Sequence, residues 1–146
     1  MADRTATVTW KGTLTEGQGT IQSGSGALAN LPVTWGSRVE MPEGKTSPEE
    51  LLAAAEAECY AMVLTNMLSK AGNTPDRLEV TATCTVERQE GGLKITTMRL
   101  DVGGQVPGVD GDTFARMANE AEQACPVSNA LRGNVQMSVN ASLSSS

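Results

Sequence analysis

Three cysteines and no histidine define the chemistry open to this chain of 146 residues. Without histidine, neither a Ser-His-Asp triad nor a Cys-His dyad can form, and no histidine can bind a metal. Cys59 lies in a nearly apolar segment with helical character, and Cys125 stands directly before Pro126. Any reactive cysteine must therefore draw its thiolate from arginine, from a helix dipole or from local hydrogen bonds.

Each cysteine calls for a different interpretation. A cysteine in an apolar helix is about as often a small buried hydrophobe as a reactive group, so both interpretations of Cys59 stay open. The proline after Cys125 pushes this residue out of the α region and can begin a new helix, whose N-terminus would stabilise a thiolate. Cys84 falls on the inward face of a predicted strand, which indicates a core residue.

The helix that would carry Cys59 has a well-marked start. Ser47 is the predicted N-cap, Pro48 occupies the first helical position, and Glu50 completes a capping box. The helix is predicted to run to about Lys70 and is apolar on nearly every face. Such a helix must be covered on all sides, which favours a second subunit.

The remaining segments show strand and helix patterns in turn. Period-two alternation predicts strands, and apolar residues three or four apart predict helices. The predicted elements are strands at 6–10 and 20–22, an irregular stretch at 28–39, a hairpin of strands at 78–86 and 93–102, helices at 113–124 and 127–131, and a strand at 135–143. Asp112 is the expected N-cap of the helix at 113–124. This order predicts an α+β fold in a single domain covering residues 1–146.

Charge and composition exclude several classes of partner. The net charge of −6 argues against binding to nucleic acid, which needs clustered Lys and Arg. Glu56, Glu58 and Asn66 interrupt the apolar region at 51–68, which argues against a membrane span. With no sign of a secretory leader, the three cysteines indicate thiols in a reducing compartment, so a cytoplasmic location is expected. We expect neither a metal nor a cofactor.

Motifs spread along nearly the whole chain together form a recognisable pattern. They are the segment 46–55, Cys59 ten residues after Glu49, the run Cys125-Pro126-Val127-Ser128, Trp10 with the glycine-rich turn after it, and the segments 37–40 and 106–110. This pattern resembles the OsmC/Ohr family of thiol-dependent organic hydroperoxide reductases, and its OsmC branch more than its Ohr branch. The resemblance implies an OsmC-like fold with antiparallel strands around a long buried central helix, in an intertwined homodimer.

The resemblance also implies a role for four residues. Cys59 corresponds to the peroxidatic cysteine, which becomes a sulfenic acid, and Cys125 to the resolving cysteine, which forms a disulfide with it. Arg38 corresponds to an arginine that stabilises the thiolate, and Glu49 to a glutamate that orients this arginine. The implied substrate is an organic hydroperoxide, reduced to an alcohol, and the implied reductant is an external dithiol of the lipoyl type.

Simpler interpretations of the two charged residues remain. Arg38 could be a solvated charge at the end of a strand, and Glu49 a favourable carboxylate in the first turn of a helix. Glu49 also lies ten residues before Cys59, which is about 15 Å along a helix. An arginine bound to Glu49 would reach Cys59 of its own chain only under strain, so the sequence favours supply of Arg38 and Glu49 by the partner subunit.

Two acidic residues depart from the family pattern. Glu56 stands where the family often has a histidine, and Glu58 where it often has a small residue. Glu56 lies on the same helical face as Cys59, and a nearby carboxylate raises the pKa of a thiol. We therefore expect Glu56 to slow formation of the thiolate.

Two other functions remain compatible with the sequence. The apolar residues could form a groove that binds a hydrophobic ligand, with the cysteines incidental. Alternatively, a Cys59–Cys125 bond could change the shape of a redox-responsive dimer without turnover.

Overall fold

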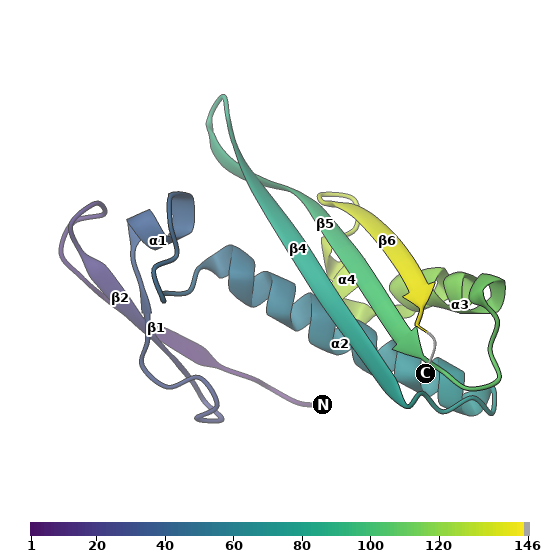
Figure 1. Cartoon of the computed structure of the whole chain (residues 1–146). Coiled ribbons are helices and arrows are strands. Elements are labelled where there is room, and N and C mark those ends of the chain that lie inside the picture. The colour runs from purple at the N-terminus through teal and green to yellow at the C-terminus, as the bar shows by residue number, and fades with distance from the viewer. Residues whose placement is uncertain (145–146) are drawn as a thin grey trace. The chain divides into compact units, whose positions relative to one another are not determined.

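The computed structural model describes residues 1–144 and divides the chain into two compact units (Figure 1). The first unit covers Met1–Leu51 and the second covers Leu52–Ser146. The chain contains strands paired in sheets together with separate helices, which is an α+β fold, as the sequence predicts.

The first unit is built on a small antiparallel sheet. Its strands are β1 (Ala6–Lys11), β2 (Gln18–Ser23) and β3 (Leu31–Val33), which pair in the order β1-β2-β3. The short helix α1 (Trp35–Val39) follows β3.

The prediction of an irregular stretch at 28–39 is wrong, because the segment holds both β3 and α1. Thr34 Oγ1 accepts a hydrogen bond from Ser37 N at 3.0 Å, and Ser37 Oγ accepts one from Thr34 N at 2.9 Å. This reciprocal cap uses a serine where glutamate or glutamine is usual, and it supports a helix of only five residues. So short a helix shows no apolar periodicity.

The long helix α2 (Pro48–Lys70) has the predicted bounds. At its start, Ser47 Oγ accepts a hydrogen bond from Glu50 N at 3.1 Å. The Glu50 carboxylate accepts instead from Thr46 Oγ1 at 3.0 Å, so only half of the expected capping box forms. At the other end Gly72 adopts a φ of 85°, a conformation that glycine takes without strain and that ends the helix.

The second unit combines a three-stranded sheet with three helical segments. Antiparallel strands β4 (Arg77–Gln89) and β5 (Gly92–Gln105) form the predicted hairpin, and β6 (Gln136–Leu143) pairs with β5. The helices α3 (Gly111–Ala124) and α4 (Pro126–Leu131) lie between β5 and β6 in the chain.

Two details of the second unit differ from the expectations. Strand β6 runs parallel to β5, whereas antiparallel strands were expected, because the crossover through α3 and α4 returns the chain to the end of the sheet at which β5 began. The N-cap of α3 is Asp110 and not Asp112, since Asp110 Oδ1 accepts from Thr113 N at 2.7 Å.

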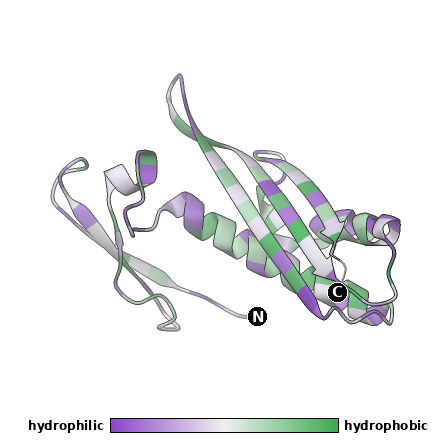
Figure 2. Ribbon diagram, in the orientation of Figure 1, coloured by the Kyte–Doolittle hydropathy of each residue, from purple (hydrophilic) through white to green (hydrophobic). Residues whose placement is uncertain are grey.

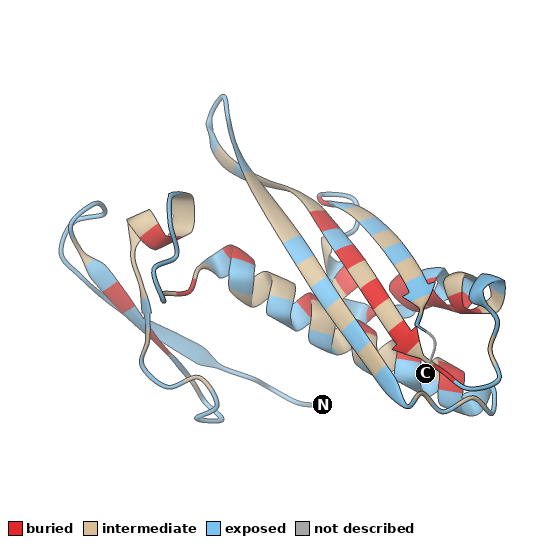
Figure 3. Cartoon of the chain, in the orientation of Figure 1, coloured by how far each residue is buried: buried red, intermediate tan, exposed pale blue. Residues whose placement is uncertain are grey.

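The core of the second unit lies between the sheet and the helices. On α2 a single stripe at four-residue spacing is fully buried: Glu56 begins it, and its apolar part is formed by Tyr60, Leu64 and Leu68. This apolar part packs with residues of β5 and α3, namely Leu100, Val102, Phe114, Met117 and Ala121. Figure 3 shows these buried positions, and Figure 2 shows the apolar residues that extend along α2 beyond them.

Other faces of α2 are half-buried or exposed in the single chain, and Met62 is 64% exposed. By length and composition α2 could cross a membrane, a test that core helices of soluble proteins also pass. Within one chain, then, the helix buries one stripe and leaves apolar surface uncovered.

Candidate active site

The structure brings two of the three cysteines together. Cys59 lies in the middle of α2 and is half-buried, and Cys125 is fully buried at the junction of α3 and α4. Their thiol groups share a hydrogen bond. Cys84 is half-buried on β4, where it pairs with Met98 of β5. The pair that the sequence singled out is therefore positioned for direct sulfur chemistry.

The break between α3 and α4 determines what lies against Cys59. Cys125 is at once the C-cap of α3 and the N-cap of α4, with extended backbone angles of φ −75° and ψ 120°, and Pro126 begins α4. The backbone N–H of Val127 donates a hydrogen bond to the sulfur of Cys59.

The sequence assigned the amides of this helix start to Cys125, and the structure corrects that assignment. The Cys125 side chain makes no capping hydrogen bond, so an amide of the first turn is left for the neighbouring helix. A thiolate at Cys59, the residue expected to react first, is the one that this amide stabilises.

The surroundings of Cys59 favour the neutral thiol overall. Burial raises the pKa of Cys59, and the Val127 amide opposes this by stabilising the thiolate. The hydrogen bond and the charge interaction with Cys125 raise the pKa further, and the charge of Glu56 makes the smallest contribution in the same direction.

Glu56 is fully buried and is held by a residue that the sequence analysis gave no role. Ser128 Oγ, on α4, donates a hydrogen bond to Glu56 Oε1. Burial raises the pKa of Glu56, the hydrogen bond from Ser128 lowers it, Glu122 raises it and Arg132 lowers it. Glu58, the other acidic departure from the family pattern, is exposed to solvent.

Glu122 and Arg132 complete the polar surroundings of Glu56. Arg132 Nη1 and Glu122 Oε1 form an ion pair at 2.8 Å, and Arg132 Nη2 donates to the Glu122 carbonyl at 3.1 Å. Sequence reasoning gave no role to Glu122, Arg132 or Ser128. For Glu122 a signal existed, because it follows Ala118 and Ala121 on the buried face of α3, where an acidic residue needs a partner. For Ser128 the signal was its place in the motif one turn after Cys125.

Arg38 and Glu49 form a second pair, within the first unit. Nε and Nη2 of Arg38 donate to Glu49 Oε1 at 3.0 and 2.8 Å. Glu49 is 5% exposed, and its Oε2 has no hydrogen-bond partner among residues 1–144. Arg38 lies in the last turn of α1 and not at the end of a strand. The cysteine pair belongs to the second unit.

Arg38 also lines an apolar groove of about 410 Å³ in the first unit. The groove is formed by side chains of β1, β2 and the loop between them, of the segment around Trp35 and of the start of α2, among them Trp10, Leu14, Ile21, Pro48 and Leu51. A guanidinium beside an apolar surface can contact the polar end of a molecule whose hydrocarbon part lies in the groove.

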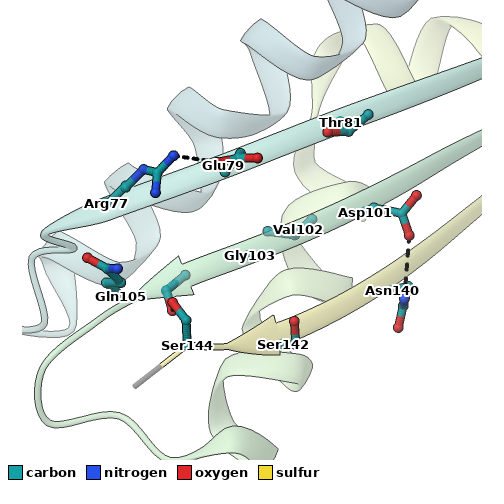
Figure 4. A pocket seen from close by; sticks show the side chains of 11 residues that line it. Arg77, Glu79, Thr81, Asp101, Val102, Gly103, Gln105, Asn140, Ser142 and Ser144 are labelled. Atoms are coloured by element: carbon teal, nitrogen blue, oxygen red, sulfur yellow. Dashed lines mark hydrogen bonds and ion pairs between the residues drawn. The ribbon is translucent and has the colours of Figure 1, made fainter. Parts of the chain in front are cut away.

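A depression of about 310 Å³, lined mostly by polar side chains, lies on the second sheet (Figure 4). Asp101 of β5 and Asn140 of β6 share a hydrogen bond of 3.4 Å there, and Arg77 pairs with Glu79 on β4. No cysteine lines this depression, so it has no part in sulfur chemistry. Over the described residues, no cluster of three or more His, Cys, Asp or Glu side chains is arranged to hold a metal ion.

Comparisons with known proteins give a consistent result. Residues 41–140 match the family model described as OsmC-like protein. Peroxiredoxin OsmC of Escherichia coli strain K12 is 37% identical over 128 residues, which cover 88% of this chain and 89% of that protein. An organic hydroperoxide resistance protein of Xanthomonas axonopodis pv. citri is 27% identical over 64% of this chain and 65% of its own length.

Solved structures share the fold. The organic hydroperoxide resistance protein OhrB of Bacillus subtilis superposes with a TM-score of 0.75 at 28% identity, over 94% of this chain and 98% of that one. The OsmC-like protein VCA0330 of Vibrio cholerae gives a TM-score of 0.77 over 97% of this chain and 100% of that one, and at 18% identity it bears on the fold alone.

Proposed function

Because the chain belongs to the OsmC-like protein family, we propose that it is a thiol-dependent peroxidase that reduces organic hydroperoxides to alcohols. The peroxiredoxin and organic hydroperoxide resistance relatives support a peroxidase-type role. The observation that carries the proposal is the contact between the thiols of Cys59 and Cys125. Two thiols in contact, one of them bound by a backbone amide, are suited to a cycle of oxidation and disulfide formation.

The proposed reaction has three steps. The Cys59 thiolate attacks one oxygen of the hydroperoxide, the O–O bond breaks, and the alkoxide takes up a proton to leave as the alcohol. Cys59 is then a sulfenic acid. The Cys125 thiol attacks the Cys59 sulfur, so that the disulfide forms, the S–O bond breaks and water leaves. An external dithiol, for which we propose a lipoyl-type compound, reduces the disulfide by thiol exchange.

Arg38 is the proposed source of positive charge for the first step. Two hydrogen bonds to the buried carboxylate of Glu49 orient its guanidinium. We assign it the stabilisation of the Cys59 thiolate and of the negative charge that develops on the leaving oxygen. The apolar groove beside Arg38 supports a preference for hydrophobic peroxides over hydrogen peroxide.

Steady-state consumption of cumene hydroperoxide with an excess of dithiol tests the function. The wild type should turn over, Cys59→Ser should abolish consumption, and Cys84→Ser should retain it as the matched control. Mass spectrometry after one equivalent of peroxide should find a bond between Cys59 and Cys125. A disulfide that involves Cys84 would overturn the assignment of Cys59 and Cys125 as the reacting pair. A wild-type protein that consumes no peroxide would favour ligand binding or a redox-responsive dimer instead.

The proposal includes a homodimer in which the partner subunit supplies Arg38 and Glu49. The uncovered apolar surface of α2 supports a second subunit, since a monomer would leave this surface in water. Mixing Cys59→Ser subunits with Arg38→Ala subunits should restore one working site in each heterodimer. If confirmed heterodimers show no recovery, both residues act within one subunit, and sedimentation as a monomer would refute the dimer.

A further inference from the structure

The buried hydrogen bond between Ser128 and Glu56 lies one helical turn from each cysteine. Glu56 precedes Cys59 by three residues on α2, and Ser128 follows Cys125 by three residues. Ser128 Oγ donates to Glu56 Oε1, and both side chains are fully buried. The same two segments therefore meet at two neighbouring points, one joined by the thiols and one by the hydroxyl and carboxyl groups.

Helix α4 depends on contacts with its neighbours. It spans six residues, which is too short to be stable without tertiary contacts. Beyond its C-terminal end, Arg132 binds Glu122 of α3 through the ion pair at 2.8 Å. The structure thus holds α4 to α3 through Arg132, and to α2 through the Val127 amide on Cys59 and through the buried hydrogen bond from Ser128 to Glu56.

Loss of the Ser128 hydroxyl would leave a buried carboxyl group without a partner. Glu56 Oε2 already lacks a hydrogen-bond partner within the described chain, so Ser128 provides the one hydrogen bond found for this carboxyl there. A buried polar group in that state is unfavourable and draws in water or shifts the surrounding helices. Such a shift would be transmitted to Cys125, one turn away on the same short segment.

We propose that Ser128 and Glu56 are a positioning pair that holds Cys125 against Cys59 and so sets the rate of disulfide closure. This inference rests on the proposed peroxidase cycle for its role in turnover. In the closure step the Cys125 sulfur attacks the sulfenic acid of Cys59, the S–S bond forms, the S–O bond breaks and water leaves. The positioning effect acts on closure, and it is measured separately from the first oxidation, on which the charge of Glu56 acts through the pKa of Cys59.

Two measurements separate positioning from general stability. The first is the rate at which the Cys59 sulfenic acid closes to the disulfide after a rapid pulse of peroxide. The second is the dithiol–disulfide equilibrium in glutathione buffers, which gives the effective concentration of Cys125 at Cys59. Ser128→Ala should lower the closure rate and the effective concentration of Cys125 by about tenfold each, the order expected from a small misplacement of reacting groups. Ser138→Ala, at an exposed position on β6, is the matched control and should match the wild type.

The partner residue gives an independent test by rescue. In Glu56→Gln the amide oxygen can still accept from Ser128, so closure should stay within about threefold of the wild type. Glu56→Ala removes the acceptor and should reproduce the defect of Ser128→Ala. If Ser128→Ala does not fold, the contrast between Glu56→Gln and Glu56→Ala decides the question.

Wild-type closure and a wild-type glutathione equilibrium in Ser128→Ala or Glu56→Ala would overturn the inference. The equilibrium needs no peroxide, so it distinguishes this failure from failure of the proposed function. A wild type that leaves cumene hydroperoxide unchanged, while Ser128→Ala still shifts the glutathione equilibrium, would refute the peroxidase and uphold the positioning pair.

Discussion

The close approach of Gly104 on β5 to Phe114 on α3 predicts a specific sensitivity of the second unit. A Cβ atom at Gly104 would lie 2.6 Å from Cζ and 2.9 Å from Cε1 of Phe114, and 3.3 Å from Cδ2 of Leu78. Phe114 is fully buried, so its ring cannot move aside into solvent. Gly104→Ala therefore overpacks the core, which costs about 1–3 kcal/mol of the free energy of unfolding.

The neighbouring glycine is a matched control. At Gly103 a Cβ would meet only the Glu79 carbonyl oxygen at 4.0 Å, and neither Gly103 nor Gly104 has a positive φ. Gly103→Ala should thus stay within about 0.5 kcal/mol of the wild type. In a chain of this size a loss of about 2 kcal/mol lowers Tm by roughly 4–8 °C, so calorimetry resolves the two variants.

A double variant tests the named contact. Gly104→Ala combined with Phe114→Leu should lose less stability than the sum of the two single changes, because the smaller side chain relieves the clash. Equal melting temperatures for Gly104→Ala and Gly103→Ala would refute the packing argument, as would strict additivity in the double variant.

Three further predictions concern buried polar groups. Glu56→Gln should lower the pKa of Cys59 and speed its alkylation by iodoacetamide at neutral pH, because a charge that raises this pKa is removed. Glu58→Gln, at an exposed position, is the control. Unchanged alkylation in Glu56→Gln would contradict the effect of the Glu56 charge on Cys59. Burial raises the pKa of Glu56, so the folded state binds the proton of this carboxyl group more tightly than the unfolded state does. The free energy of unfolding should therefore fall as pH rises from 4.5 through the raised pKa. Urea titrations at a series of pH values should find no such fall in Glu56→Gln. Tyr60→Phe removes the 2.7 Å hydrogen bond from the Tyr60 hydroxyl to the Ala118 carbonyl and should cost about 1–1.5 kcal/mol in urea unfolding, with wild-type stability as the refuting result.

Elements with strong local signals were predictable from the sequence. Pro48 at the first helical position and Gly72 after the last turn determine the ends of α2 through backbone geometry alone. The α1 helix was not predictable, because Thr34 and Ser37 cap five residues that carry no periodic pattern. The parallel direction of β6 depends on how a crossover packs against the sheet, which no local residue pattern encodes.

The candidate site was predictable in its members more than in its contacts. Resemblance to a family pointed to Cys59 and Cys125, and the structure finds their thiols in contact. The amide of Val127 on Cys59 and the hydroxyl of Ser128 on Glu56 join segments far apart in the sequence. Such contacts follow from tertiary packing, so spacing along the chain could not reveal them.

The position of Pro126 affects the pKa of Cys59 through the start of α4. It starts α4 directly after Cys125, which leaves the amide of Val127 to donate to Cys59. That amide lowers the pKa of Cys59, whereas burial, Cys125 and Glu56 all raise it. The proposed cycle needs the thiolate, and within the second unit the contributions to the pKa of Cys59 favour the neutral thiol overall. This shortage is the reason for the proposal that Arg38 of the partner subunit supplies the charge: its guanidinium is already oriented by a buried carboxylate, so its orientation costs little further entropy when the thiolate forms.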